Sequence, residues 1–349
     1  MITMNYSTAS LKAAWTPVLK EETATLGYWL HWQVYVCVIM ILFVMAISAY
    51  IIWKYEDFSA SECIGSELRP QSLHSLYEDE SWRPCLKEIH PAWLMAYRMC
   101  SFIVMLAVLT TNAIFDGIEI FYFYTQWTFA LVTIYFGIGS LLSMYGCYRY
   151  LNRVAGDRDN LQKLDTEQGT YVAPTLEETT NVRTSKRYTF QGDQYDRQKA
   201  GIYGYIFQIV YQTTAGAVIF TDCVFWFIIV PFLTNKDYNV RPILIGMHSI
   251  NFVLLLVDTF LNSLRFPWFR ISYFILWTAT FVIFQWVLHA CVSLWWPYDF
   301  LDLSTPFAPL WYFLLTVMHL PCYALFYYMV RLKKFLLLRW FPQSYQCAV

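Results

Sequence analysis

Long apolar runs alternate with polar segments along most of the chain, and seven of these runs are long enough to cross a bilayer. A transmembrane α-helix needs about 20 predominantly apolar residues. The pattern therefore predicts an all-α, multi-pass bundle of about seven transmembrane helices. The run at 203–232 is long enough to tilt or kink, which leaves six or eight spans as alternatives. The seven runs cover residues 28–53, 92–115, 122–148, 203–232, 242–264, 271–295 and 306–330.

Composition agrees with this pattern, because 58% of the residues are hydrophobic and only 14% are charged. A soluble domain carries about 25% charged residues. The 24 Lys and Arg residues nearly balance the 25 Asp and Glu residues, so no nucleic-acid partner is predicted. The nine cysteines are scattered without paired spacing, and they indicate neither a disulfide framework nor a zinc module.

The polar segments divide the chain into five parts. The two longest internal ones, 54–91 and 150–200, show no sustained periodicity and are expected to be loops, partly disordered. The parts are a tail at 1–27, helices 1–3 within 28–149, the polar loop 150–200, helices 4–7 within 201–332 and a basic tail at 333–349.

Positive charge predicts the orientation in the membrane. Of the 24 Lys and Arg residues, only Lys12, Lys20, Lys236 and Arg241 fall on one side of the predicted bundle. Basic residues resist translocation, so the other side is predicted to be cytosolic. The N-terminus is then lumenal or extracellular and the C-terminus cytosolic, in an endomembrane or the plasma membrane. Both long loops face the cytosol, where they offer surfaces for cytosolic partners.

The helix predicted at 242–264 carries a polar face. At about 100° per residue, His248, Asn251, Asp258 and Asn262 fall within one arc. A polar or ionisable side chain in hydrocarbon is costly unless it faces the bundle interior, which makes each one a candidate site residue. The alternative is hydrogen bonding between helices, worth about 0.6 kcal/mol per contact.

Two further helices carry polar residues. Gln285 and His289 are four residues apart on one helix, and Asp222 lies on the helix at 203–232. For the amides, hydrogen bonding between helices is the favoured interpretation. For His248 and His289 both interpretations stay open, because an amide would hold helices together without a titratable ring. Each histidine lies about 9 Å below the lumenal end of its helix, and Thr125 begins the 122–148 helix at that same end.

Three blocks of sequence around these residues resemble one known family. They are Phe123–Gly139, Gly246–Asn251 and Trp286–Tyr298, in that order within residues 120–330. The segments are similar to the androgen-induced membrane hydrolase and Rolling stone superfamily. In its hydrolase branch, the resemblance implies, an intramembrane Thr is the nucleophile and a His is the base, cleaving fatty acid esters of hydroxy fatty acids.

Carried over residue by residue, the resemblance makes Thr125 the nucleophile and His248 the base. His289 matches the second member of a His-His pair whose first position is Leu288 here. The implied partners are membrane lipids and a lipid-ester substrate, and no cofactor is implied. The N-terminal span and the two long loops are closer to the Rolling stone branch, for which a developmental role is expected.

The residue types are chemically coherent with this role. A threonine hydroxyl is a weak nucleophile and needs an adjacent base, while Asn251, Gln285 and Asp222 are candidates to support that base. Two other classes stay open: a non-catalytic protein in signalling or development, and a haem or metal protein with His248 and His289 as paired ligands. No cofactor-binding or metal-binding motif is present in the sequence.

Overall fold

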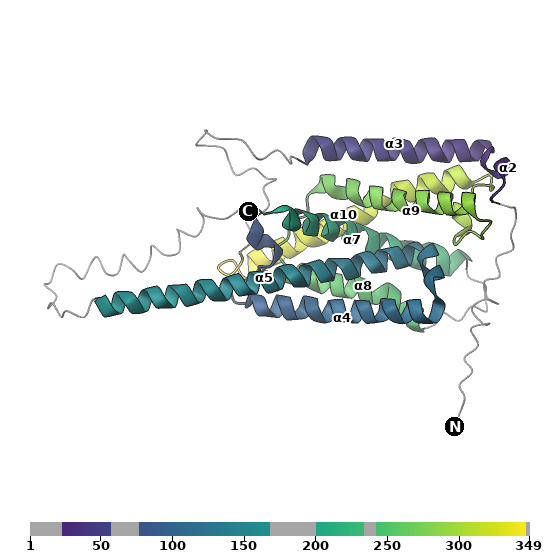
Figure 1. Cartoon of the computed structure of the whole chain (residues 1–349). Coiled ribbons are helices and arrows are strands. Elements are labelled where there is room, and N and C mark those ends of the chain that lie inside the picture. The colour runs from purple at the N-terminus through teal and green to yellow at the C-terminus, as the bar shows by residue number, and fades with distance from the viewer. Residues whose placement is uncertain (1–22, 57–76, 168–199, 234–241, 347–349) are drawn as a thin grey trace, which may run out of the picture.

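The computed structural model describes residues 23–56, 77–167, 200–233 and 242–346. Most of the tail predicted at 1–27 and the central parts of the loops predicted at 54–91 and 150–200 lie outside these ranges. The described residues are almost entirely helical and form no β-strand. Seven long helices run side by side as one bundle (Figure 1). The predicted all-α architecture is therefore confirmed.

Six of the long helices have the length and apolar composition of membrane spans. The remaining one, α8, contributes a shorter apolar stretch at Gly246–Leu261. The chain is a multi-pass membrane protein with six to seven spans, whose outer apolar side chains contact lipid. The long helices are α3 (Trp32–Tyr55), α4 (Pro91–Asp116), α5 (Tyr124–Glu167), α7 (Ile202–Val224), α8 (Pro242–Leu261), α9 (Ile271–Cys291) and α10 (Ala308–Trp340).

Short helices occupy the connections and define the two ends of the bundle. We call the end that carries α2 the α2 end; α5, α8 and α10 begin there, and α4 and α7 run toward it (Figure 1). We call the opposite end the Arg98 end. The short helices are α2 (Leu26–Trp29), η1 (Glu78–Ser81), η2 (Ile118–Tyr122), η7 (Trp268–Arg270) and η8 (Asp299–Leu301).

Two helices continue beyond the ends predicted from hydropathy. α5 extends to Glu167, where a polar loop was predicted from residue 150, and α10 extends to Trp340. Outside the bilayer a helix needs no apolar face, and the 149–167 stretch contains no proline and many good helix formers. Hydropathy therefore marks where the membrane ends and not where the helix ends.

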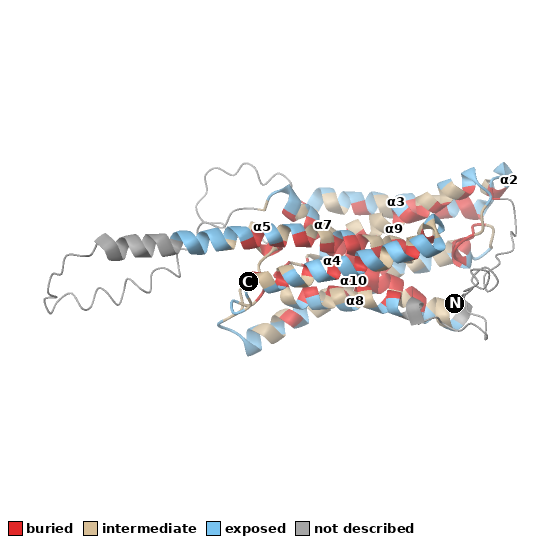
Figure 2. Ribbon diagram, turned by 60° about the horizontal axis from the view of Figure 1, so that its bottom comes forward, coloured by how far each residue is buried: buried red, intermediate tan, exposed pale blue. Residues whose placement is uncertain are grey.

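α7 forms the centre of the bundle and is buried along most of its length (Figure 2). It packs against α5, α9, α10 and α8, whereas α3 lies at the periphery. At Phe225 the α7 hydrogen-bonding pattern changes to that of a π-helix, η6 (Phe225–Leu233), which contains Pro231. π-Helical segments are rare and often mark functional positions.

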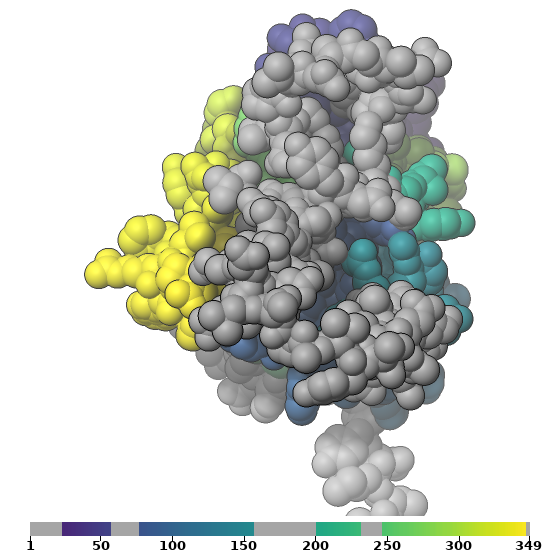
Figure 3. Space-filling model, turned by 90° about the vertical axis from the view of Figure 1, so that its left-hand side faces the viewer, coloured from purple at the N-terminus to yellow at the C-terminus, as the bar shows by residue number. Residues whose placement is uncertain are grey.

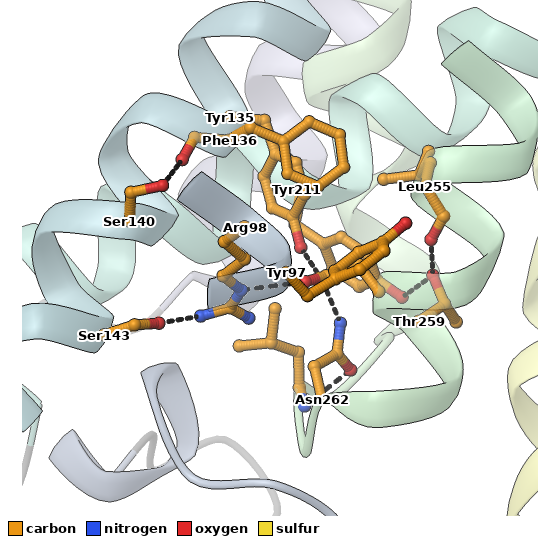
Figure 4. Close-up of polar contacts among 12 residues, drawn as sticks. Tyr97, Arg98, Tyr135, Phe136, Ser140, Ser143, Tyr211, Leu255, Thr259 and Asn262 are labelled. Atoms are coloured by element: carbon orange, nitrogen blue, oxygen red, sulfur yellow. Dashed lines mark hydrogen bonds and ion pairs between the residues drawn. The ribbon is translucent and has the colours of Figure 1, made fainter. Parts of the chain in front are cut away.

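A buried ion pair organises the Arg98 end. Arg98 Nε on α4 donates to Asp258 Oδ1 on α8 at 2.8 Å, and both side chains are completely buried. Arg98 Nη1 also donates to Ser143 Oγ of α5 at 2.9 Å. Tyr135 donates its hydroxyl proton to Asp258, and Asn262 Nδ2 donates to the same carboxylate at 2.9 Å. Figure 4 shows Arg98 reaching Ser143, with Asn262 on the other side of its guanidinium.

Two further ion pairs hold the connecting segments against the same end. Both Arg265 nitrogens donate to Glu80 Oε1 of η1, whereas Arg270 pairs with both carboxylate oxygens of Glu56, which follows α3. The shortest distance in each pair is 2.7 Å. Figure 3 looks at this end, where the C-terminal part of α10 projects in yellow. Some of the basic residues from which the orientation was predicted thus also form ion pairs inside the protein.

Candidate functional site

A cavity of about 840 Å³, counted together with its open mouth, lies between α3, α5, α7, α9 and α10. Aliphatic and aromatic side chains form most of its wall, and none of the described residues that line it is Lys, Arg, Asp or Glu. The hydroxyls and the single imidazole in the wall are contributed by Tyr124, Thr125, Thr221, Thr278, Tyr298, Tyr312, Thr316 and His319. The wall suits an uncharged, largely apolar ligand.

Thr125 lies at the α2 end of this cavity, in the first turn of α5, and its side chain is half-buried. Tyr298, in the segment between α9 and α10, is its neighbour. Burial raises the pKa of the Tyr298 phenol to about 12, although hydrogen bonding with the Thr125 side chain and backbone opposes that rise. The Tyr298 phenol is therefore protonated at neutral pH.

The segment that carries Tyr298 closes the α2 end of the cavity through Phe300 and Leu301. It is anchored by Tyr28 of α2, whose hydroxyl donates to Asp302 Oδ1 at 2.8 Å. The same hydroxyl accepts hydrogen bonds from Trp296 Nε1 and from the backbone of Leu303. These hydrogen bonds tie the segment that carries Tyr298 to α2.

His319 of α10 lines the cavity nearer the middle of the bundle. Seven residues separate it from Tyr312, or about 10 Å along the helix. Its Nδ1 lies 2.8 Å from the Leu315 carbonyl oxygen, which fixes the proton on that nitrogen. The ring lies between Phe220 and Phe274, with both centroid distances at 4.5 Å. This orientation is typical of a histidine held by packing.

His248, the base implied by the resemblance, is not among the described residues that line the cavity. Its Nδ1 lies 3.5 Å from Asp222 Oδ1 of α7, longer than a well-formed hydrogen bond. The Phe225 ring stacks on the imidazole, with centroids 3.7 Å apart and ring planes at 8°. The structure thus brings His248 and Asp222 together and covers the imidazole with Phe225.

Thr125 and His248 lie at the same end of the bundle but on different sides of α7. No hydrogen bond joins them within the described ranges. Thr128, one turn beyond Thr125, shares a 3.0 Å hydrogen bond with Thr221 of α7. Thr221 faces the cavity, while the adjacent Asp222 faces His248. The α7 segment from Thr221 to Phe225 therefore separates the two residues.

The other predicted supporting residues have local partners. Gln285 Nε2 donates to the Tyr122 carbonyl at 2.9 Å, so it connects α9 to η2. Asn251 is fully buried, and its Oδ1 accepts from the Phe252 amide. His289 stacks on Trp296, and its two ring nitrogens face the Gln285 and Trp295 carbonyl oxygens at 2.7 and 3.3 Å. None of these three lines the cavity in the described part of the chain.

Two residues of this region carry no distinctive sequence signal. Tyr298 and Phe225 are ordinary aromatic residues in a chain that is 20% aromatic. The only local hint is the length of the 203–232 run, which is consistent with the irregular helix that begins at Phe225.

The helices and the cavity define the class of this chain: an all-α, multi-pass membrane protein with an apolar cavity inside its bundle. A comparison with protein-family models, curated proteins and solved structures gives no match.

Proposed function

We propose that this protein binds a membrane lipid in the cavity and hydrolyses an ester within it, with Thr125 as the nucleophile and His248 as the base. One observation carries the proposal: the Thr125 hydroxyl lies at one end of an otherwise largely apolar cavity inside a membrane bundle. A lipid ester such as a fatty acid ester of a hydroxy fatty acid already resides in the bilayer. Its acyl chain matches the apolar wall, and its ester carbonyl is the group that a hydroxyl nucleophile would attack.

In the proposed reaction, Thr125 Oγ1 attacks the ester carbonyl carbon while its proton passes to the His248 imidazole. The carbonyl oxygen becomes an oxyanion, toward which the Tyr298 phenol is a suitable donor. The ester C–O bond then breaks, and the leaving alkoxide takes the proton from His248. In the second half, water attacks the acyl carbon and loses a proton to His248, the bond from that carbon to Thr125 Oγ1 breaks, and the fatty acid leaves. Thr125 Oγ1 takes the proton back from His248, which restores both residues. Asp222 supports the cationic form of His248 between these transfers.

A non-catalytic lipid-binding role, in signalling or in development, is the second candidate. It is favoured by the position of Phe225, which is part of the cavity wall and also covers His248. In that role the two cytosolic loops would contact protein partners. The haem or metal alternative gains no support from His289, because both of its ring nitrogens face backbone carbonyl oxygens.

The two candidates are separated by changing the Thr125 hydroxyl alone. In protein reconstituted into vesicles, Thr125→Val is expected to lower kcat/KM for long-chain lipid esters by about 10³-fold or more, because the nucleophile is lost. Thr125→Ser should keep part of the activity. Hydrolysis of an ester panel is followed by mass spectrometry, together with binding of a fluorescent fatty acid.

Thr316→Val is the matched control, since Thr316 also lines the cavity and donates to the Tyr312 carbonyl in its own helix. It should stay within a few-fold of the wild-type rate. Unchanged hydrolysis in Thr125→Val would remove the proposed mechanism. Fatty acid binding without hydrolysis in the unmodified protein would favour the second candidate.

The orientation proposal is tested separately. Because nearly all basic residues are on one side, the N-terminus is proposed to be lumenal or extracellular and the C-terminus cytosolic. A protease added to sealed, cytosol-side-out microsomes should then cut within 149–200 and spare 1–27, as read by antibodies to tags at each end. Protection of 149–200 would reverse the orientation.

A further inference from the structure

Phe225 contacts His248 and also lines the cavity. Its ring covers the His248 imidazole in a nearly parallel stack. Both side chains are almost fully buried. The Phe225 ring is thus the part of the wall that lies between the cavity and His248. Within the described residues, His248 is the only histidine paired with a carboxylate.

The backbone at Phe225 is irregular. The residue ends α7 and begins η6, and its amide is shared between the Asp222 and Thr221 carbonyl oxygens. Pro231 lies inside η6 and removes one amide donor from the helix. Shared and missing hydrogen bonds make this the least regular part of a span whose preceding part is a regular, deeply buried α-helix.

His248 itself is held from another side. Asp222, one turn before Phe225 on α7, lies 3.5 Å from the imidazole nitrogen Nδ1. The Phe225 ring covers a face of the imidazole, not this edge. The ring can therefore leave while the contact between Asp222 and His248 remains.

We infer that Phe225 is a gate that sets ligand specificity: an acyl chain long enough to fill the cavity displaces the Phe225 ring and opens the cavity to His248. A short chain leaves the ring in place. This inference rests on the proposed hydrolytic function, and it makes assembly of the catalytic pair depend on the substrate, as in induced fit. The ligand class it selects is an uncharged lipid with a long unbranched chain.

Chain-length preference tests the gate. For 4-nitrophenyl esters, the unmodified protein should favour the 16-carbon over the 4-carbon acyl chain, and Phe225→Ala should raise kcat/KM for the 4-carbon ester by about tenfold. Phe281→Ala is the matched control, because Phe281 also lines the cavity but packs against Tyr124 and Trp127. It enlarges the cavity without uncovering His248. Equal changes in both variants would overturn the gate.

A second measurement does not depend on hydrolysis. Carbethoxylation of His248 by diethyl pyrocarbonate, followed by mass spectrometry, should be slow in the unmodified protein and several-fold faster with added 1-hexadecanol. Phe225→Ala, or Phe225→Leu if the alanine variant does not fold, should react quickly without 1-hexadecanol, and Phe281→Ala should react slowly. The same rate in all variants, with and without 1-hexadecanol, would show that Phe225 does not control access.

The two proposals can fail independently. If Thr125→Val abolishes hydrolysis while the Phe225 and Phe281 variants behave alike, the gate is wrong and the proposed function stands. If hydrolysis does not depend on Thr125, the proposed function is wrong, and the carbethoxylation rates still decide whether Phe225 covers His248 as a movable gate.

Discussion

Replacing Arg98 by Met is expected to lower the free energy of unfolding by about 3–5 kcal/mol, because the change leaves a buried carboxylate without its cation. Arg98 and Asp258 are both fully buried, and their contact joins α4 to α8. Removing the guanidinium also leaves Ser143 without its donor. Unfolding in mixed micelles with increasing sodium dodecyl sulfate measures the change.

The double replacement of Arg98 by Met and Asp258 by Leu should recover much of this loss, since neither buried charge then remains. Arg83→Met is the exposed control. Arg83 pairs with Asp79 at the surface, with 38% of its side chain exposed, and its loss should cost less than about 1 kcal/mol. A double variant no more stable than Arg98→Met alone would argue against charge burial as the cause.

Gly146→Ala is expected to destabilise the protein by about 1–3 kcal/mol through overpacking. A Cβ atom at Gly146 would lie 2.1 Å from Trp82 Cγ and 2.7 Å from its Cβ, so the ring cannot stay in place. Trp82 follows η1, and its displacement should loosen the segment that carries Glu80 and Arg83. Limited proteolysis of residues 77–90 should therefore accelerate, together with a lower thermal midpoint.

Gly156→Ala in the same helix is the matched control. Gly156 is exposed, and no heavy atom lies within 4 Å of a Cβ added there. This change should leave the protein unaffected or stabilise it by up to about 1 kcal/mol. Faster proteolysis in both variants would indicate a helix effect and not a clash with Trp82.

The number and place of the helices could be predicted because membrane burial demands long apolar runs, and each predicted run corresponds to an observed helix. The ends of α5 and α10 could not be predicted, because a polar stretch in water can either continue a helix or form a loop. The change at Phe225 was equally hidden, because α-helix and π-helix share the same hydrophobic composition.

Polar residues were harder to interpret, because periodicity gives the face of a helix but not its partner. The stripe on α8 divides into two regions: His248 faces Asp222, whereas Asp258 and Asn262 belong with Arg98 at the other end. The predicted topology placed Thr125 and His248 near the same face of the membrane. It did not indicate that α7 stands between them, since that depends on how the helices are arranged around the bundle.

α5 connects a position inside the membrane with a point far outside it. Its 44 residues span about 66 Å, more than twice the hydrocarbon thickness of about 30 Å, and its far end projects alone beyond the bundle (Figure 1). Thr125 lies in the first turn of this rod. A tilt of about 5° around that turn would move the other tip by about 6 Å. A small tilt near Thr125 is thus enlarged at the outer end of α5, where spectroscopy in the aqueous phase can measure the displacement.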